Sequence, residues 1–169
     1  MAPVEDRAAQ LEDDLDLAVA AYADEDDDWS VVELEASVTG DLDDLLAALR
    51  SLPGDLGVIA MVAVDEDFFV IVRVEGPRVS VMLSDVTAAD DWDLAASVVD
   101  FLGLPEPDDD DDSEPVGELD LLDDLGVTEG DLLDLLDDDE AYPDEVLADV
   151  ARELGFGELF DEVVGLSPA

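Results

Sequence analysis

The sequence of 169 residues contains no cysteine and no histidine, and all five of its basic residues are arginine. Without cysteine there is no disulfide framework, no cysteine-ligated zinc site and no thiol nucleophile. Without histidine the chain lacks the commonest general base and a major metal ligand. The absence of lysine excludes Schiff-base chemistry, and serine and threonine have neither histidine nor lysine to activate them. We therefore predict that the protein is not an enzyme, has no catalytic residues and uses no cofactor.

Positive charge is scarce, because five basic residues face 51 acidic ones and the formal net charge is −46. A chain this acidic repels nucleic acid and anionic membranes, and it attracts cations and basic proteins. We therefore expect a basic protein partner, and no direct contact with nucleic acid or with a membrane. The N-terminus has no basic and apolar regions of the signal-peptide kind, and no apolar stretch approaches the roughly 18 residues of a membrane span, which predicts a cytoplasmic protein.

Core-forming residues are not scarce, since 49% of the chain is hydrophobic. The apolar residues are grouped in runs such as "GVIAMVAV" and "FFVIVRV". A chain with this content can bury an ordinary core, which argues against disorder throughout. We predict folded modules with acidic surfaces, preceded by a flexible acidic tail over residues 1–14.

Residues 15–104 are predicted to form an α+β domain. Apolar runs bounded by turn residues predict five strands, near 16–23, 29–36, 57–64, 67–74 and 78–85. Leucines at helical spacing predict a helix over 41–50 with Asp41 as N-cap, and a second helix covers 87–103 with Thr87 as cap and Phe101 on its apolar face. The order β-β-α-β-β-β-α and the tight turns indicate a five-stranded antiparallel sheet. The third and fourth strands are apolar on both faces, so each side of the sheet must be covered.

The rest of the chain divides into an acidic linker and a helical module. Residues 105–117 hold five consecutive aspartates between prolines, which repel one another and predict a disordered linker. Residues 118–169 are predicted to form a small helical bundle. Its helices include a short one ending at Gly126, one starting at Thr128, and one with Pro143 in the first turn and Gly155 as its stop.

One acidic stretch, "DEDDDWSVVELE" at residues 24–35, resembles a calcium loop. Asp24, Asp26 and Asp28 occupy the first, third and fifth positions of an EF-hand loop, and Glu35 occupies the twelfth. The sixth position should be glycine because the chain turns sharply there, but here it is Trp29. The alternation that follows is typical of a strand, whereas an EF-hand loop is flanked by helices. An acidic hairpin connection accounts for the pattern better, and we predict no metal site.

Two groups of residues are candidates for partner binding. Arg73 and Arg78 bracket the turn "VEGP", where they either contact an acidic group or pair with acids across the strands. Tyr142, Phe156 and Phe160 are either anchors of a partner-binding helix or the core of a small bundle. The sequence favours the second alternative for both groups.

Several segments together resemble a known family. The segments are "DFFVIVRVEGPRVSVMLSD", "DWDLA", the Asp-rich linker, "LDLLDDLGV" and "YPDEVLADVARELGF". They are similar to the tRNA adenosine deaminase-associated proteins of high-GC bacteria, and the resemblance covers roughly residues 16–165. It implies association with a tRNA adenosine deaminase and no defined activity. The chain is not the deaminase itself, which needs a histidine- and cysteine-ligated zinc site.

Three functional hypotheses follow. The first is a non-catalytic acidic accessory protein that binds the basic surface of a partner, which the resemblance implies is a tRNA adenosine deaminase. The second is a divalent-cation-binding protein. The third is a purely salt-adapted acidic protein with no basic partner. Self-association as a homodimer through the sheet is compatible with all three.

Overall fold

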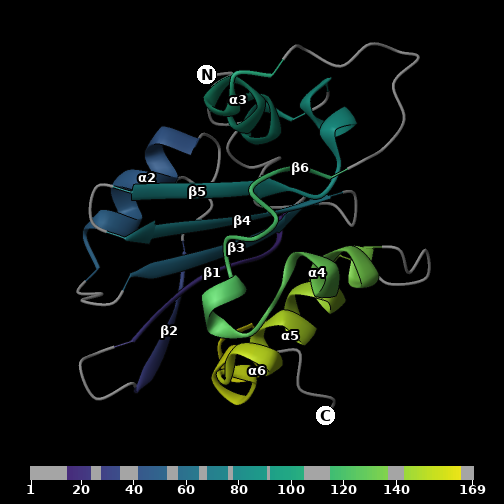
Figure 1. The fold of residues 1–169 in the computed structure, drawn as a ribbon. Coiled ribbons are helices and arrows are strands. Elements are labelled where there is room, and N and C mark those ends of the chain that lie inside the picture. Colours follow the sequence, from purple (N-terminus) through teal and green to yellow (C-terminus); the bar gives the residue numbers. More distant parts are fainter. Residues whose placement is uncertain are drawn as a thin grey trace.

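The computed structural model describes residues 15–23, 28–34, 42–52, 57–64, 68–75, 78–90, 92–104, 115–136 and 143–164. In these ranges a single antiparallel sheet lies between two layers of helices (Figure 1). The α+β class and the antiparallel sheet are those that the sequence predicts. Because strand side chains alternate between the two sides, each helical layer packs against its own set of strand residues.

The sheet has the strand order β2-β1-β3-β4-β5-β6, with all neighbours antiparallel. The strands are β1 (Leu15–Ala23), β2 (Trp29–Glu33), β3 (Val58–Val64), β4 (Phe68–Glu75), β5 (Arg78–Leu83) and β6 (Val116–Gly117). Every residue of β3 and all but the last of β4 are buried. This burial on both faces is what their continuous apolar runs predict.

The sixth strand corrects two predictions. The sequence indicated five strands, and it placed Val116 and Gly117 in a disordered linker over 105–117. In the structure Val116 pairs with Leu83 and Gly117 with Met82. Residues 105–114 of the predicted linker lie outside the described residues. The N–H of Glu118 then donates to the carbonyl of Val81 at 2.9 Å. A strand of two residues is too short to show any hydrophobic period, so it is specified by its contact with β5 and not by local pattern.

One sheet face, here called face A, is covered by α2 (Leu42–Arg50), the 3₁₀ turn η2 (Val86–Asp90) and α3 (Asp93–Leu102). The predicted helix over 87–103 therefore begins six residues later than expected. The Asp85 carboxylate accepts hydrogen bonds from the backbone N–H and the hydroxyl of Thr87, at 2.9 and 2.6 Å. These bonds stabilise a separate turn, so Thr87 is not the cap of α3. Asp41, the predicted cap of the first helix, lies outside the described residues.

The opposite face, face B, is covered by η3 (Asp123–Leu125), α4 (Glu129–Leu136), α5 (Pro143–Leu154) and α6 (Gly157–Val164). The predicted helix start at Thr128 is confirmed, because its hydroxyl accepts from the N–H of Asp131 while the Asp131 carboxylate accepts from the N–H of Thr128. The short helix expected before Gly126 is instead a turn followed by η3.

The helices of face B share one hydrophobic core with the sheet. Strand residues such as Ile59, Phe69 and Ile71 pack in the same cluster as Leu147 and Val150 of α5. The prediction that both sides of the central strands are covered is therefore confirmed. The division of the chain into two domains on either side of residues 105–117 stays a prediction.

Candidate protein-interaction surface

Carboxylates dominate the described surface. Amphipathic helices bury their leucine and valine stripes against the sheet, and this turns their acidic residues to solvent. Within the described ranges, exposed carboxylates occur on each of α2 to α6, namely Asp43, Asp44, Asp93, Asp100, Glu129, Asp134, Glu145, Glu153, Glu158 and Glu162. Arg152 is exposed and pairs with Asp149 of the same helix at 3.0 Å. Both helical layers therefore present negative charge outward.

The stretch that resembles a calcium loop, residues 24–35, consists of a strand connection followed by strand β2 (Trp29–Glu33). Asp28 is exposed, while Asp24, Asp26 and Glu35 lie outside the described residues. Ala23 at the end of β1 pairs directly with Trp29 at the start of β2. The intervening residues thus join an antiparallel hairpin, whereas an EF-hand loop joins two helices. Among the described residues no group of three or more acidic side chains is placed to hold a metal ion.

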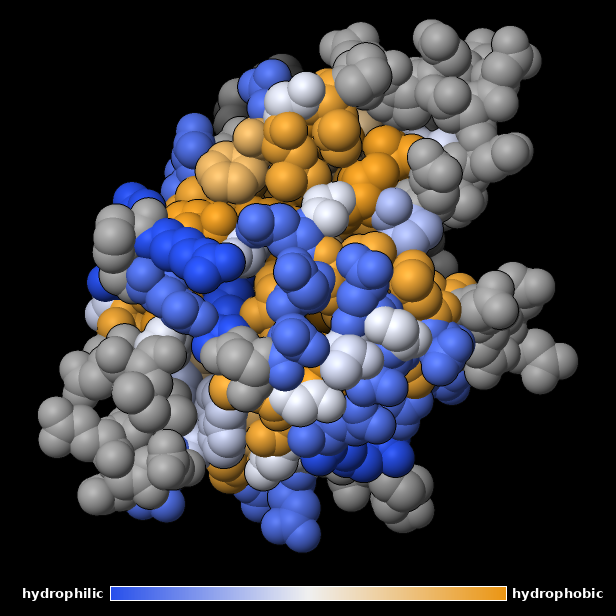
Figure 2. Space-filling model, in the orientation of Figure 1, coloured by the Kyte–Doolittle hydropathy of each residue, from blue (hydrophilic) through white to orange (hydrophobic). Residues whose placement is uncertain are grey.

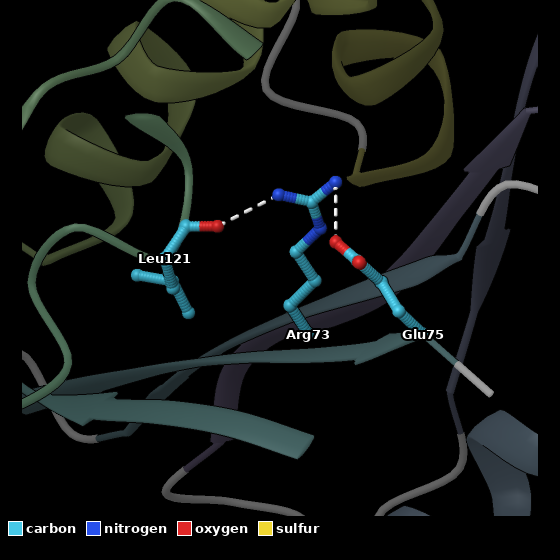
Figure 3. Close-up of polar contacts among 3 residues, drawn as sticks. All are labelled: Arg73, Glu75 and Leu121. Atoms are coloured by element: carbon cyan, nitrogen blue, oxygen red, sulfur yellow. Dashed lines mark hydrogen bonds and ion pairs between the residues drawn. The ribbon is translucent and has the colours of Figure 1, made fainter. Parts of the chain in front are cut away.

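Arg73 is a buried cation that links strand β4 to the turn before η3 (Figure 3). Its side chain extends from β4 on face B and is 8% exposed. One guanidinium nitrogen donates to the carbonyl of Leu121 at 2.8 Å, and the other contacts the Glu75 carboxylate at 2.6 Å. Leu121 belongs to the turn between β6 and η3. These contacts support the alternative in which Arg73 pairs with an acid of the same chain, here Glu75.

Arg78 occupies the same end of the β4–β5 hairpin but is exposed. It pairs with Glu75 in the strand register. The two arginines that the sequence grouped together are therefore in different environments. Of these two arginines only Arg78 is exposed, and its role in binding stays a prediction.

Replacing Arg73 by methionine should lower the free energy of unfolding by about 1–3 kcal/mol, because the buried carbonyl of Leu121 loses its donor. The measurement is urea-induced unfolding followed by circular dichroism. Arg78→Met is the matched control, since it removes the same charge from an exposed position and should change stability by less than about 0.5 kcal/mol. If the two substitutions lowered the free energy of unfolding equally, the Arg73–Leu121 hydrogen bond would not contribute to stability.

The aromatic candidates lie in the core. The ring of Phe156 packs against the Trp29 ring, with centroids 4.8 Å apart, and Phe160 is also fully buried. Tyr142 lies outside the described residues. This arrangement supports the alternative in which Phe156 and Phe160 are core residues. The core includes the sheet as well as the helices, because Trp29 belongs to β2.

Sequence reasoning missed the exposed apolar residues. Phe101 and Leu104 at the C-terminal end of α3 are 47% and 37% exposed, and Leu133 of α4 is 41% exposed. Figure 2 shows hydrophobic surface over the region of α3 in the upper part of the molecule. The buried stripe of α3 is centred on Ala95, Val98 and Val99, so Phe101 falls at its margin. The expectation that Phe101 lies on the buried face is therefore wrong.

The described helices include none long and apolar enough to cross a membrane.

Comparison with known proteins identifies relatives. The family described as "Rv3753c-like tRNA adenosine deaminase-associated protein" matches residues 16–157. "Protein Rv3753c" of Mycobacterium tuberculosis (strain ATCC 25618 / H37Rv) is 41% identical over 119 residues, which cover 69% of this chain and 69% of that protein. No solved structure matches significantly. The matched range runs from the first strand to the end of α5.

Proposed function

Because the chain belongs to the Rv3753c-like tRNA adenosine deaminase-associated protein family, we propose that it is a non-catalytic accessory protein that binds the basic surface of a tRNA adenosine deaminase. The family description supplies the association. An enzyme that handles tRNA must present positive charge to the phosphate backbone. An accessory protein with a net charge of −46 is complementary to such a surface. The proposal places this protein with its partner in the cytoplasm.

The observation that carries the proposal is the spread of exposed carboxylates over both helical layers. The helices α2 and α3 on one side of the sheet have exposed acidic residues, and so have α4, α5 and α6 on the other side. A negative field that surrounds the protein steers a basic partner during diffusion and favours it over acidic proteins. Nucleic acid is disfavoured as a direct ligand for the same reason.

The proposed contact makes the accessory protein a competitor of tRNA. Both are polyanions, and both would occupy the cationic surface of the deaminase. While the accessory protein is bound, it would limit access of tRNA to the enzyme. The expected role is therefore control of substrate access, with no chemical step carried out by this chain.

The affinity for the deaminase of the same organism should fall at least about tenfold between roughly 50 and 500 mM NaCl, because salt screens charges separated by more than a Debye length. The measurement is biolayer interferometry with immobilised deaminase, repeated with unmodified tRNA as competitor. Added tRNA should displace the accessory protein at low salt.

The control is an unrelated acidic protein of similar net charge, which should bind much more weakly if surface shape also contributes. Binding that persists unchanged in about 1 M NaCl would refute an electrostatic contact. Binding that tRNA does not reduce would refute the shared surface.

A further inference from the structure

Strand β2 is the outer strand at one edge of the sheet (Figure 1). It pairs with β1 over five consecutive residues, and no other strand in the described ranges lies on its far side. The opposite edge differs, because part of β5 is paired with β6. An unpaired edge exposes a row of backbone donors and acceptors to which another strand can add.

The register of β2 shows which backbone groups point outward. The N–H of Leu34 donates to the carbonyl of Ala18 at 2.8 Å. In an antiparallel pair the residues that bond to the neighbour alternate with residues that point away from it. Leu34, Val32 and Ser30 therefore point toward β1, and the backbone groups of Trp29, Val31 and Glu33 point to the open side.

The edge lacks three of the features that commonly prevent pairing, namely proline, lysine and a bulge. Residues 29–33, "WSVVE", include no proline and no lysine, and their pairing with β1 has no bulge. Val31 packs with the core of face B and Val32 with the core of face A, and both are only half-buried. The outer strand therefore offers a half-buried valine on each face and is regular enough to act as a template.

Negative charge around this edge decides what kind of strand fits it. Glu33 is exposed at the end of β2. Helix α6 packs against β2 and carries exposed Glu158 and Glu162, four residues apart. A second copy of the chain also has a net charge of −46, and repulsion between the two copies opposes self-association at this edge. A segment that carries arginine or lysine would meet complementary charge.

We propose that the open edge of β2 is the docking site for an extended basic segment of the partner protein, which adds to the sheet as a further strand. This inference rests on the proposed function and names the surface that carries it. Main-chain hydrogen bonds to Trp29, Val31 and Glu33 provide the pairing. Apolar side chains of the incoming strand contact Val31 and Val32, and its basic side chains meet Glu33 and the carboxylates of α6.

The test compares Val31→Pro with Val31→Ala in binding to the deaminase. Proline removes the outward N–H of residue 31 but leaves the inward bonds of β2 to β1, a position at which proline is tolerated. Alanine removes similar packing and keeps the N–H. We expect Val31→Pro to weaken binding at least about tenfold and Val31→Ala by less than about threefold, consistent with loss of main-chain pairing. Circular dichroism and thermal unfolding verify that both variants fold.

A charge variant tests the same edge without altering its backbone. The triple substitution Glu33→Gln, Glu158→Gln and Glu162→Gln should weaken binding and reduce its dependence on salt. The matched control neutralises three exposed acids elsewhere, Asp100→Asn, Glu118→Gln and Asp134→Asn, and should have a clearly smaller effect. If Val31→Pro does not fold, this pair of variants decides the question.

The outcomes separate the docking site from the function. If the wild-type protein does not bind the deaminase, the proposed function fails and the docking site fails with it. If the wild-type protein binds and Val31→Pro or the triple variant binds equally well, only the docking site is refuted. If size-exclusion chromatography with light scattering shows a dimer that Val31→Pro converts to a monomer with unchanged deaminase binding, β2 pairs with itself and the inference is overturned.

Discussion

Phe160→Ala is expected to lower the free energy of unfolding by about 3–5 kcal/mol, because the substitution leaves a cavity in a closely packed core. The Phe160 side chain is fully buried in the cluster between face B and its helices. The measurement is equilibrium unfolding in urea with unchanged m-value. Phe101→Ala is the matched control, since the same atoms are removed from a half-exposed position and should cost less than about 1 kcal/mol.

The same pair of variants separates the two interpretations of the aromatic residues. As a core residue, Phe160 affects binding only through the fraction of folded protein. A Phe160→Ala variant with wild-type stability and weakened partner binding would contradict the core assignment. It would restore the alternative in which the C-terminal aromatic residues are anchors for a partner.

Gly117→Ala is expected to lower the free energy of unfolding by at least about 2 kcal/mol, since both the backbone conformation and the surrounding space require glycine. Gly117 has a φ of +103°, a conformation that side chains disfavour. A β-carbon at this position would lie 2.9 Å from the Cα of Met82 and closer still to the Val81 carbonyl oxygen. Strand β6 must therefore separate from β5. The measurements are thermal unfolding and amide exchange at Glu118.

Gly126→Ala is the control for the backbone contribution alone. Gly126 has a similar φ of +106°, but a β-carbon there would meet no atom within 4 Å. Its replacement should cost about 1–2 kcal/mol from the left-handed conformation. If the two alanine variants were equally stable, close packing of β6 on β5 would not contribute, and the assignment of Gly117 as a contact position would be wrong.

Local pattern predicted the elements whose residues are apolar in long runs. The strands β3 and β4 were located to within one residue at each end, because unbroken runs of seven apolar residues in β3 and five in β4 have few alternatives to a central strand. Pro143 and Gly155 likewise marked the limits of α5, since each has a strong positional preference at a helix end.

Elements that depend on distant contacts were not predictable. Val116 and Gly117 form a strand only because β5 offers an edge. The start of α3 was missed for a local reason instead, since the Asp85 carboxylate accepts two hydrogen bonds from Thr87 and these stabilise a separate turn. The order of the strands in the sheet could also not be predicted from hydrophobic periodicity. Nothing in the sequence indicates that β1 lies between β2 and β3, and this placement is what makes β2 an edge.

The candidate site shows the same division. Net charge alone indicated a basic partner and needed no structure. By contrast, Arg73 and Arg78 look equivalent in sequence, five residues apart around one turn. Only the fold shows that the first bonds to Leu121 and the second is exposed. The backbone N–H of Val31 points away from β1 because of the pairing register. The type of residue at this position does not indicate that direction.

The packing of face B has a consequence for synthesis of the chain. Ile59, Phe69 and Ile71 leave the ribosome long before Leu147, Val150 and Phe160, which cover them. Closing so long a loop is slow, and an uncovered apolar sheet face is prone to aggregation while it waits. During this interval, repulsion between the many carboxylates already synthesised keeps nascent chains apart. The same acidity that we propose for partner binding would therefore also keep unfinished chains from aggregating.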